Sequence, residues 1–175
     1  MRKYTIFTIK KDALAKGLAK EIILDLERFY DVVAMNRMII DSSTVAMLKE
    51  GEWQNNWKPY PDERIKDLCY VYESGEVMAL LCRIKIEEDA INFGKKLKGN
   101  HHLAHLCSPD TIRGKYVDLS LVDSIYTDDN MVSYLCDKDN NKISSVPNII
   151  HAVDNDIEFS QHLDVYFKDI DPTTV

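Results

Sequence analysis

The chain has 175 residues, of which 45% are hydrophobic and 29% charged, a balance typical of one globular domain. No run of about eighteen apolar residues occurs and the N-terminus enters a strand pattern at once, so neither a membrane span nor a signal peptide is expected. The net charge is −7, with 12 acids and 3 bases in residues 117–175 against 17 acids and 19 bases in residues 1–116, which argues against a general nucleic-acid binder.

The pattern of apolar residues predicts alternating strands and helices. The expected strands cover residues 4–9, 32–40, 77–86 and 149–151. The expected helices cover residues 12–29, 62–72, 87–97 and 156–167, with a short helix capped by Ser42 or Ser43. Taken in chain order, these elements predict a ferredoxin-like α+β sandwich of βαββαβ type, with an antiparallel sheet and additional helices.

The whole chain, residues 1–175, is expected to form a single domain, with an insertion at about residues 119–145. Within that insertion, apolar residues alternate at Val132, Tyr134 and Cys136, and a polar turn follows, so a β-hairpin is expected. The four cysteines are scattered and include no Cys-x-x-Cys pair. This favours reduced thiols and a cytoplasmic location over a disulfide framework.

The segment Asn-Ile-Ile-His-Ala-Val-Asp, residues 148–154, reads as a short apolar strand that delivers His151 to a turn. Asn155 is a candidate cap for the following helix, with Glu158 placed three residues later as a capping box requires. Such a histidine is held by rigid elements and open to a ligand, and histidine can accept a phosphoryl group covalently. An isolated histidine in a turn is more often a surface or cap residue, so the assignment depends on other motifs.

Four segments in order resemble the nucleoside diphosphate kinase family. They are Thr-Ile-Lys-Lys-Asp at 8–12, Gly-Leu-Ala-Lys-Glu-Ile-Ile at 17–23, Thr-Ile-Arg-Gly at 111–114 and Asn-Ile-Ile-His at 148–151. The family pattern has Ile-Lys-Pro-Asp, a Gly-Leu-x-Gly-Glu-Ile-Ile helix, Gly-Thr-Ile-Arg-Gly-Asp and Asn-Ile-Ile-His-Gly-Ser-Asp. The resemblance extends over about residues 4–167, interrupted by the insertion.

This resemblance implies transfer of the γ-phosphoryl group of ATP, or of another nucleoside triphosphate, to a nucleoside diphosphate. His151 is the implied nucleophile, and it carries the group as phosphohistidine in a ping-pong reaction. The implied cofactor is Mg²⁺, which arrives with the nucleotide and which Asp154 would contact through water. The resemblance also implies a homo-oligomer, a hexamer or tetramer.

Residues for binding nucleotide phosphate follow from the same resemblance. Arg113 offers a planar fork of donors, Lys10 a point charge at the end of the first strand, and Asn148 an amide for ribose or phosphate. Lys95 and His101 fall where the family has a phosphate-binding arginine and threonine. Taken alone, each of these residues would more often be a solvated surface residue, a partner in an ion pair or a turn residue.

Several positions depart from the family pattern. Lys11 replaces a proline, and Val153 replaces the serine two residues after the nucleophile. The family glutamate that orients the nucleophile falls on His162, whose neutral ring accepts a hydrogen bond only weakly. The base-stacking aromatic is unassigned between Trp57, Tyr60 and Arg64. The alternative function is therefore a catalytically weakened nucleotide-binding or interaction protein on the same fold.

A histidine-rich loop gives a further alternative. His101, His105 and Cys107 are side chains of the kind that zinc accepts, and they would suit a metal site or a metal-dependent hydrolase. No second ligand pair follows at zinc-finger spacing, and the loop coincides with the family's nucleotide-covering segment. A solvated or phosphate-facing loop is therefore the favoured interpretation.

Overall fold

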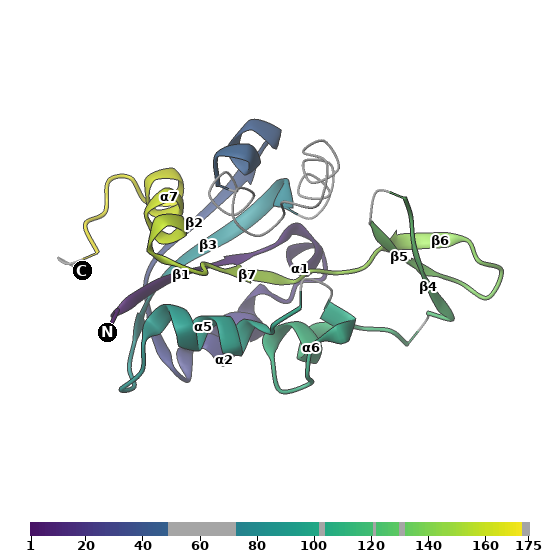
Figure 1. Cartoon of the computed structure of the whole chain (residues 1–175), viewed down its shortest axis with the longest axis horizontal. Coiled ribbons are helices and arrows are strands. Elements are labelled where there is room, and N and C mark those ends of the chain that lie inside the picture. The colour runs from purple at the N-terminus through teal and green to yellow at the C-terminus, as the bar shows by residue number, and fades with distance from the viewer. Residues whose placement is uncertain (49–72, 102–103, 121, 130–131, 173–175) are drawn as a thin grey trace.

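The main sheet has four strands, β1 (Tyr4–Ile9), β2 (Tyr30–Ile40), β3 (Gly75–Ile84) and β7 (Ile150–Ala152). They lie in the order β2-β3-β1-β7, and every neighbouring pair is antiparallel (Figure 1). This computed structural model describes residues 1–48, 73–101, 104–120, 122–129 and 132–172. Strand order and chain order together confirm the predicted ferredoxin-like α+β fold.

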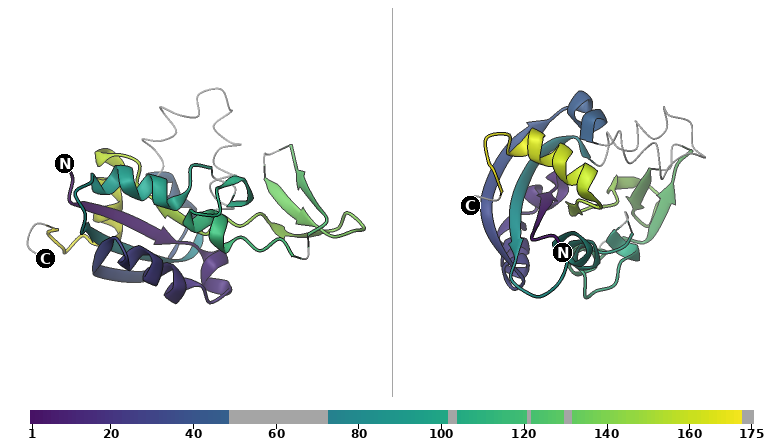
Figure 2. Two further views of the ribbon diagram at one scale, coloured as in Figure 1. Left: turned by 90° about the horizontal axis from the view of Figure 1, so that it is seen from below. Right: turned by 60° about the vertical axis from the view of Figure 1, so that its left-hand side comes forward.

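Helices cover both faces of this sheet (Figure 2). One face carries α2 (Ala19–Glu27), α5 (Ala90–Lys98) and α6 (Ile112–Tyr116), while α1 (Lys11–Ala15) lies at the end of β1 (Figure 1). The opposite face carries α7 (Asp156–Tyr166) and the helical residues 42–48. Among the segments that the structure describes, no helix has the length and apolar character needed to cross a membrane.

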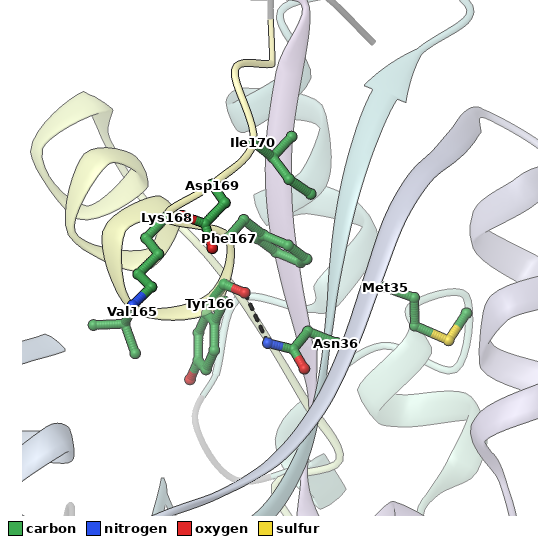
Figure 3. Close-up of a pocket in the computed structure, with 8 residues that line it drawn as sticks. All are labelled: Met35, Asn36, Val165, Tyr166, Phe167, Lys168, Asp169 and Ile170. Atoms are coloured by element: carbon green, nitrogen blue, oxygen red, sulfur yellow. Dashed lines mark hydrogen bonds between the residues drawn. The ribbon is translucent and has the colours of Figure 1, made fainter.

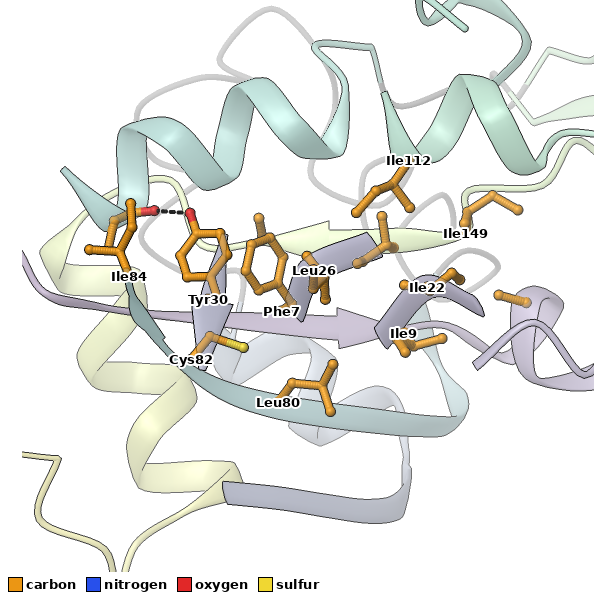
Figure 4. Close-up of a cluster of buried hydrophobic side chains, with 14 of the residues drawn as sticks. Phe7, Ile9, Ile22, Leu26, Tyr30, Leu80, Cys82, Ile84, Ile112 and Ile149 are labelled. Carbon is orange, nitrogen blue, oxygen red and sulfur yellow. Dashed lines mark hydrogen bonds between the residues drawn. The ribbon is translucent and has the colours of Figure 1, made fainter. Parts of the chain in front are cut away.

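A buried aromatic pair attaches α5 to the sheet (Figure 4). Phe7 of β1 and Tyr30 of β2 meet edge to face, with ring centroids 5.2 Å apart. The Tyr30 hydroxyl donates a hydrogen bond to the Ala90 carbonyl at 2.8 Å, so its one polar atom is satisfied inside the core. Gly94 lets the helix approach closely, because a Cβ there would lie 3.1 Å from Phe7 Cζ.

Two predicted helix boundaries are wrong. The helix expected over 12–29 is two helices, separated where Gly17 takes φ +72°, a left-handed conformation that ends α1 at little cost for glycine. The helix at 42–48 is capped by neither serine. Asp41 accepts the Thr44 N–H at 2.8 Å, and such bonds lower the pKa of Asp41 to about 2. The helix expected at 62–72 lies outside the described residues.

The segment expected to be an insertion forms a second, three-stranded sheet at one end of the molecule (Figure 1). Its strands are β4 (Ser124–Thr127), β5 (Ser133–Cys136) and β6 (Lys142–Ser145), in the order β4-β5-β6. The predicted hairpin corresponds to β5 and β6, and β4 adds a strand that was not foreseen. Lys142 Nζ lies 4.0 Å from the centre of the Tyr134 ring, a cation–π contact that supports this hairpin.

Candidate active site

Strand β7 presents His151 to the α7 side of the main sheet. Its neighbours Ile150 and Ala152 belong to the apolar cluster on the α2 and α5 side, so strand alternation turns His151 the other way. The register places His151 opposite Thr8 of β1. Only 4% of its surface is exposed, so His151 lies inside a strand and is buried, not open at a turn as expected.

Glu158, in the first turn of α7, holds the imidazole of His151. Its Oε1 lies 2.8 Å from His151 Nε2, and its Oε2 accepts the Asp154 N–H at 2.6 Å. Asn155 is the N-cap, as predicted, because its Oδ1 accepts the Glu158 N–H at 2.9 Å. A carboxylate can only accept at Nε2, so this bond selects the tautomer with hydrogen on Nε2 and leaves the lone pair on Nδ1.

His162 lies one helical turn beyond Glu158 and stacks on the nucleophile candidate. The ring centroids of His151 and His162 are 5.2 Å apart and the planes differ by 28°. His162 Nε2 is 3.6 Å from Glu158 Oε1, beyond hydrogen-bond distance. The sequence predicts His162 as the residue that orients His151 and Glu158 only as part of a helix cap, but the carboxylate that is hydrogen-bonded to His151 belongs to Glu158.

Arg113, in α6, is buried against the turn that precedes β7. Its Nε donates to the carbonyls of Asn148 and Ile150 at 3.1 and 3.0 Å, and its Nη2 donates to Asn148 Oδ1 at 3.1 Å. Its Nη1 donates to the His101 carbonyl at 2.6 Å. Thr111 caps α6 by accepting the Gly114 N–H, which fixes the start of the helix. Burial lowers the pKa of Arg113, which lies in a cage of neutral oxygens.

The turn before His151 is strained and braced. Ile149 has φ +68°, a left-handed conformation that costs a β-branched residue roughly 1–3 kcal/mol. The Asp12 carboxylate accepts the backbone N–H groups of both Asn148 and Ile149, and the Ile149 carbonyl accepts the Lys10 N–H at 2.9 Å. Asp12, which is not among the residues predicted for the site, therefore fixes the backbone that leads into His151.

Lys10 follows β1 and is buried, with 1% of its side chain exposed. Ile9 belongs to the apolar cluster on the α2 and α5 side of the sheet, so its neighbours Thr8 and Lys10 point to the opposite side. His151, which is opposite Thr8, points to that same side. The Lys10 ammonium donates to the carboxylate of Glu73, which lies just before β3. Lys10 therefore lies beside the start of β7, and its ammonium already forms an ion pair with Glu73.

Asp154, two residues beyond β7, is held by lysines of α5. Its Oδ1 accepts from Lys98 Nζ at 3.3 Å and lies 3.9 Å from Lys95 Nζ. Lys98 is buried and also donates to the Ala152 carbonyl at 3.3 Å, whereas the side chain of Lys95 is 42% exposed. The expected phosphate ligand Lys95 is therefore partly open to solvent, while Lys98, not foreseen, ties α5 to the end of β7.

The histidine loop contributes its backbone to the site. The carbonyl of His101, which precedes a 3₁₀ turn (Ala104–Leu106), accepts from Arg113 and also from the Cys107 thiol at 3.2 Å. Burial lowers the pKa of His105. Among the described residues, the group of three His, Cys, Asp or Glu side chains that converges closely enough for a metal ion lies elsewhere, at His151, Glu158 and His162.

A separate cavity of about 290 Å³ lies between β2 and the end of α7 (Figure 3). Asn36 in its wall donates from Nδ2 to the Tyr166 carbonyl at 2.8 Å. None of the candidate nucleotide residues lines this cavity. The base-stacking candidates Trp57, Tyr60 and Arg64 lie outside the described residues.

Solved structures with a similar fold include nucleoside diphosphate kinases. The enzyme of Borrelia burgdorferi, with bound vanadate and ADP as a transition-state mimic, has a TM-score of 0.67 at 19% identity, over 95% of this chain and 88% of its own. The chain has the nucleoside diphosphate kinase fold. The Halobacterium salinarum enzyme in complex with CDP gives 0.64 at 21% identity, over 98% and 93%, and that of Pyrobaculum aerophilum 0.63 at 19%, over 95% and 96%. No protein-family model and no curated protein sequence matches the chain.

Proposed function

We propose that the chain transfers the γ-phosphoryl group of a nucleoside triphosphate to a nucleoside diphosphate through a phosphohistidine at His151. The observation that carries this proposal is the 2.8 Å contact between His151 Nε2 and Glu158. This contact orients the imidazole, and the carboxylate stabilises the positive charge that the ring acquires when it is phosphorylated. The fold shared with nucleoside diphosphate kinases supports the same reaction class.

In the first half-reaction, the Nδ1 lone pair of His151 attacks the γ-phosphorus. The N–P bond forms as the bond from phosphorus to the β,γ-bridging oxygen breaks, and the nucleoside diphosphate leaves. Nε2 keeps its hydrogen, and Glu158 stabilises the cationic ring. In the second half-reaction, a terminal phosphate oxygen of the acceptor diphosphate attacks the phosphohistidine, and Nδ1 recovers its lone pair.

Lys10 and Arg113 are the proposed contacts for the transferred group, with Lys95 and His101 toward the remaining phosphates. Arg113 is proposed because, among the described residues, no carboxylate forms an ion pair with its guanidinium, although its Nε, Nη1 and Nη2 already donate to backbone carbonyls and to Asn148 Oδ1. The bond from Arg113 to Asn148 Oδ1 fixes that amide, which we assign to a ribose hydroxyl or phosphate oxygen.

Magnesium is the proposed cofactor, carried by the nucleotide's own phosphates and waters. The residues fit that arrangement better than a protein cage, because the described group that converges closely enough for an ion, His151, Glu158 and His162, offers two imidazoles, whereas magnesium prefers oxygen ligands. Asp154, the expected water-mediated contact, already accepts from Lys98. When bound, the ion supplies positive charge to the phosphate oxygens. A homo-oligomer and a cytoplasmic location belong to the same proposal, and the free thiols of Cys82 and Cys136 agree with a reducing compartment.

The second candidate is a nucleotide-binding protein with weakened or no catalysis. The ion pair of Lys10 with Glu73 favours it, because a lysine already matched by a carboxylate contributes less positive charge to the transferred group. Val153 adds to this candidate, since it offers no hydroxyl beside the nucleophile.

Incubation of the purified protein with γ-labelled ATP and Mg²⁺ separates the two candidates. A kinase takes up label that is stable to base, labile to acid, and released on addition of a nucleoside diphosphate. His151→Ala abolishes both label and exchange while the protein remains folded. Tight nucleotide binding without label supports the binding protein, and near wild-type turnover of His151→Ala contradicts the assignment of the nucleophile.

A further inference from the structure

Glu73 stands where two distant parts of the chain meet. It lies two residues before β3, and β3 runs antiparallel to β1 with Ile9 opposite Met78. The start of β3 is therefore beside the end of β1, and the Glu73 carboxylate reaches the ammonium of Lys10 there. The side chains are 1% exposed for Lys10 and 18% exposed for Glu73, so this ion pair is largely removed from solvent.

The negative charge of Glu73 acts on both cations of the proposed phosphate site. It bonds directly to Lys10, and among the charged groups that raise the pKa of Arg113 against the effect of burial, Glu73 has the largest influence. A buried ammonium needs a hydrogen-bonded anion, and an oxygen of a phosphate group serves that need as well as a carboxylate oxygen does.

We infer that Glu73 is an internal competitor for nucleotide phosphate, which holds Lys10 in the nucleotide-free protein and yields it to the terminal phosphate of a bound triphosphate. The inference rests on the proposed function in placing that phosphate at Lys10. Glu73 then lowers the affinity of the site for a nucleoside triphosphate, because its charge repels the incoming phosphate and its hydrogen bond to Lys10 must be broken before the phosphate can bind there. A merely structural Glu73, which only fastens β3 to β1, has no such effect on affinity.

The test uses Glu73→Gln, which removes the charge and keeps an oxygen that accepts from Lys10. Binding of an ATP analogue with a β,γ-imido bridge is measured by calorimetry in the presence of Mg²⁺, with AMP as the ligand that lacks the β- and γ-phosphates. The variant should bind the analogue about tenfold more tightly, which corresponds to about 1.4 kcal/mol, and should bind AMP as the wild type does.

The matched control is Glu76→Gln, because Glu76 lies in β3, three residues after Glu73, but pairs with Arg37 at an exposed position. It should leave the affinity for the analogue unchanged. Equal tightening by both variants points to a general charge effect and overturns the inference. Unchanged or weaker binding by Glu73→Gln overturns it as well, and a fall in melting temperature alone assigns Glu73 a structural role.

A structure of the wild-type protein with the same analogue tests the exchange without any substitution. Lys10 Nζ bonded to a phosphate oxygen, and no longer to Glu73, supports the inference; a Lys10–Glu73 pair that persists overturns it. Neither measurement needs phosphoryl transfer. If Glu73→Gln gains affinity and His151 never takes up label, the competitor role stands and the proposed kinase reaction fails.

Discussion

Replacing Glu158 by glutamine removes the negative charge that faces His151 and keeps the shape of the side chain. The carboxylate makes two buried contacts, 2.8 Å to His151 Nε2 and 2.6 Å to the Asp154 N–H. Glutamine can still accept one of them, but it cannot oppose a cationic imidazole. A hydrogen bond to a charged group contributes about 1.5–3 kcal/mol, so phosphorylation of His151 should slow by roughly 10- to 150-fold.

The assay is a single-turnover measurement of label uptake from γ-labelled ATP, with nucleotide affinity measured separately. Affinity should stay close to that of the wild type, because Glu158 opposes charge that develops only on transfer. The control is Asp156→Asn, an exposed first-turn acid of the same helix that pairs with Arg2 at 3.3 Å. A rate for Glu158→Gln within twofold of the wild type would refute the role given to this carboxylate.

Two further substitutions test the support of the site. Arg113→Lys keeps the positive charge, but an ammonium cannot donate to the carbonyls of Asn148, Ile150 and His101 at the same time. Both thermal stability and ATP affinity should therefore fall, the affinity by about 1–3 kcal/mol. A loss of thermal stability with unchanged ATP affinity would mean that Arg113 has only a structural role. Burial raises the pKa of Asp25, but hydrogen bonds from Lys115 and Tyr116 outweigh this effect and lower the pKa below 3.8. These bonds therefore stabilise the folded protein above pH 3.8, and their contribution is lost as the pH falls below that value. Asp25→Asn should therefore lower the free energy of unfolding at pH 7 by about 0.5–1 kcal/mol in urea titrations, with a difference that shrinks below pH 3.8, and a constant difference at all pH values contradicts this linkage.

The fold was accessible from the sequence because its elements have strong periodicity and local signals. The apolar run at 77–86 predicts the central strand β3, and Asn155 predicts the start of α7, where its side chain does cap the helix. The split between α1 and α2 was missed because apolar residues continue at helical spacing through Gly17. Only the left-handed backbone of that glycine shows the break.

The site was less accessible, because its contacts join residues whose separation in sequence carries no periodic signal. Lys10 and Glu73 meet through strand pairing between β1 and β3. Glu158 escapes prediction for a different reason. A first-turn glutamate satisfies the rules for a helix cap, and spacing alone does not reveal that its side chain turns back to His151.

Mapping the phosphorylated residue tests the central claim most directly. The wild-type protein is incubated with γ-labelled ATP and Mg²⁺, separated from nucleotide, digested at alkaline pH and analysed for modified peptides. One acid-labile phosphohistidine is expected, at His151, and it should be lost on addition of a nucleoside diphosphate, with formation of the corresponding triphosphate. Label on another residue, or nucleotide binding with no label on His151, would contradict it.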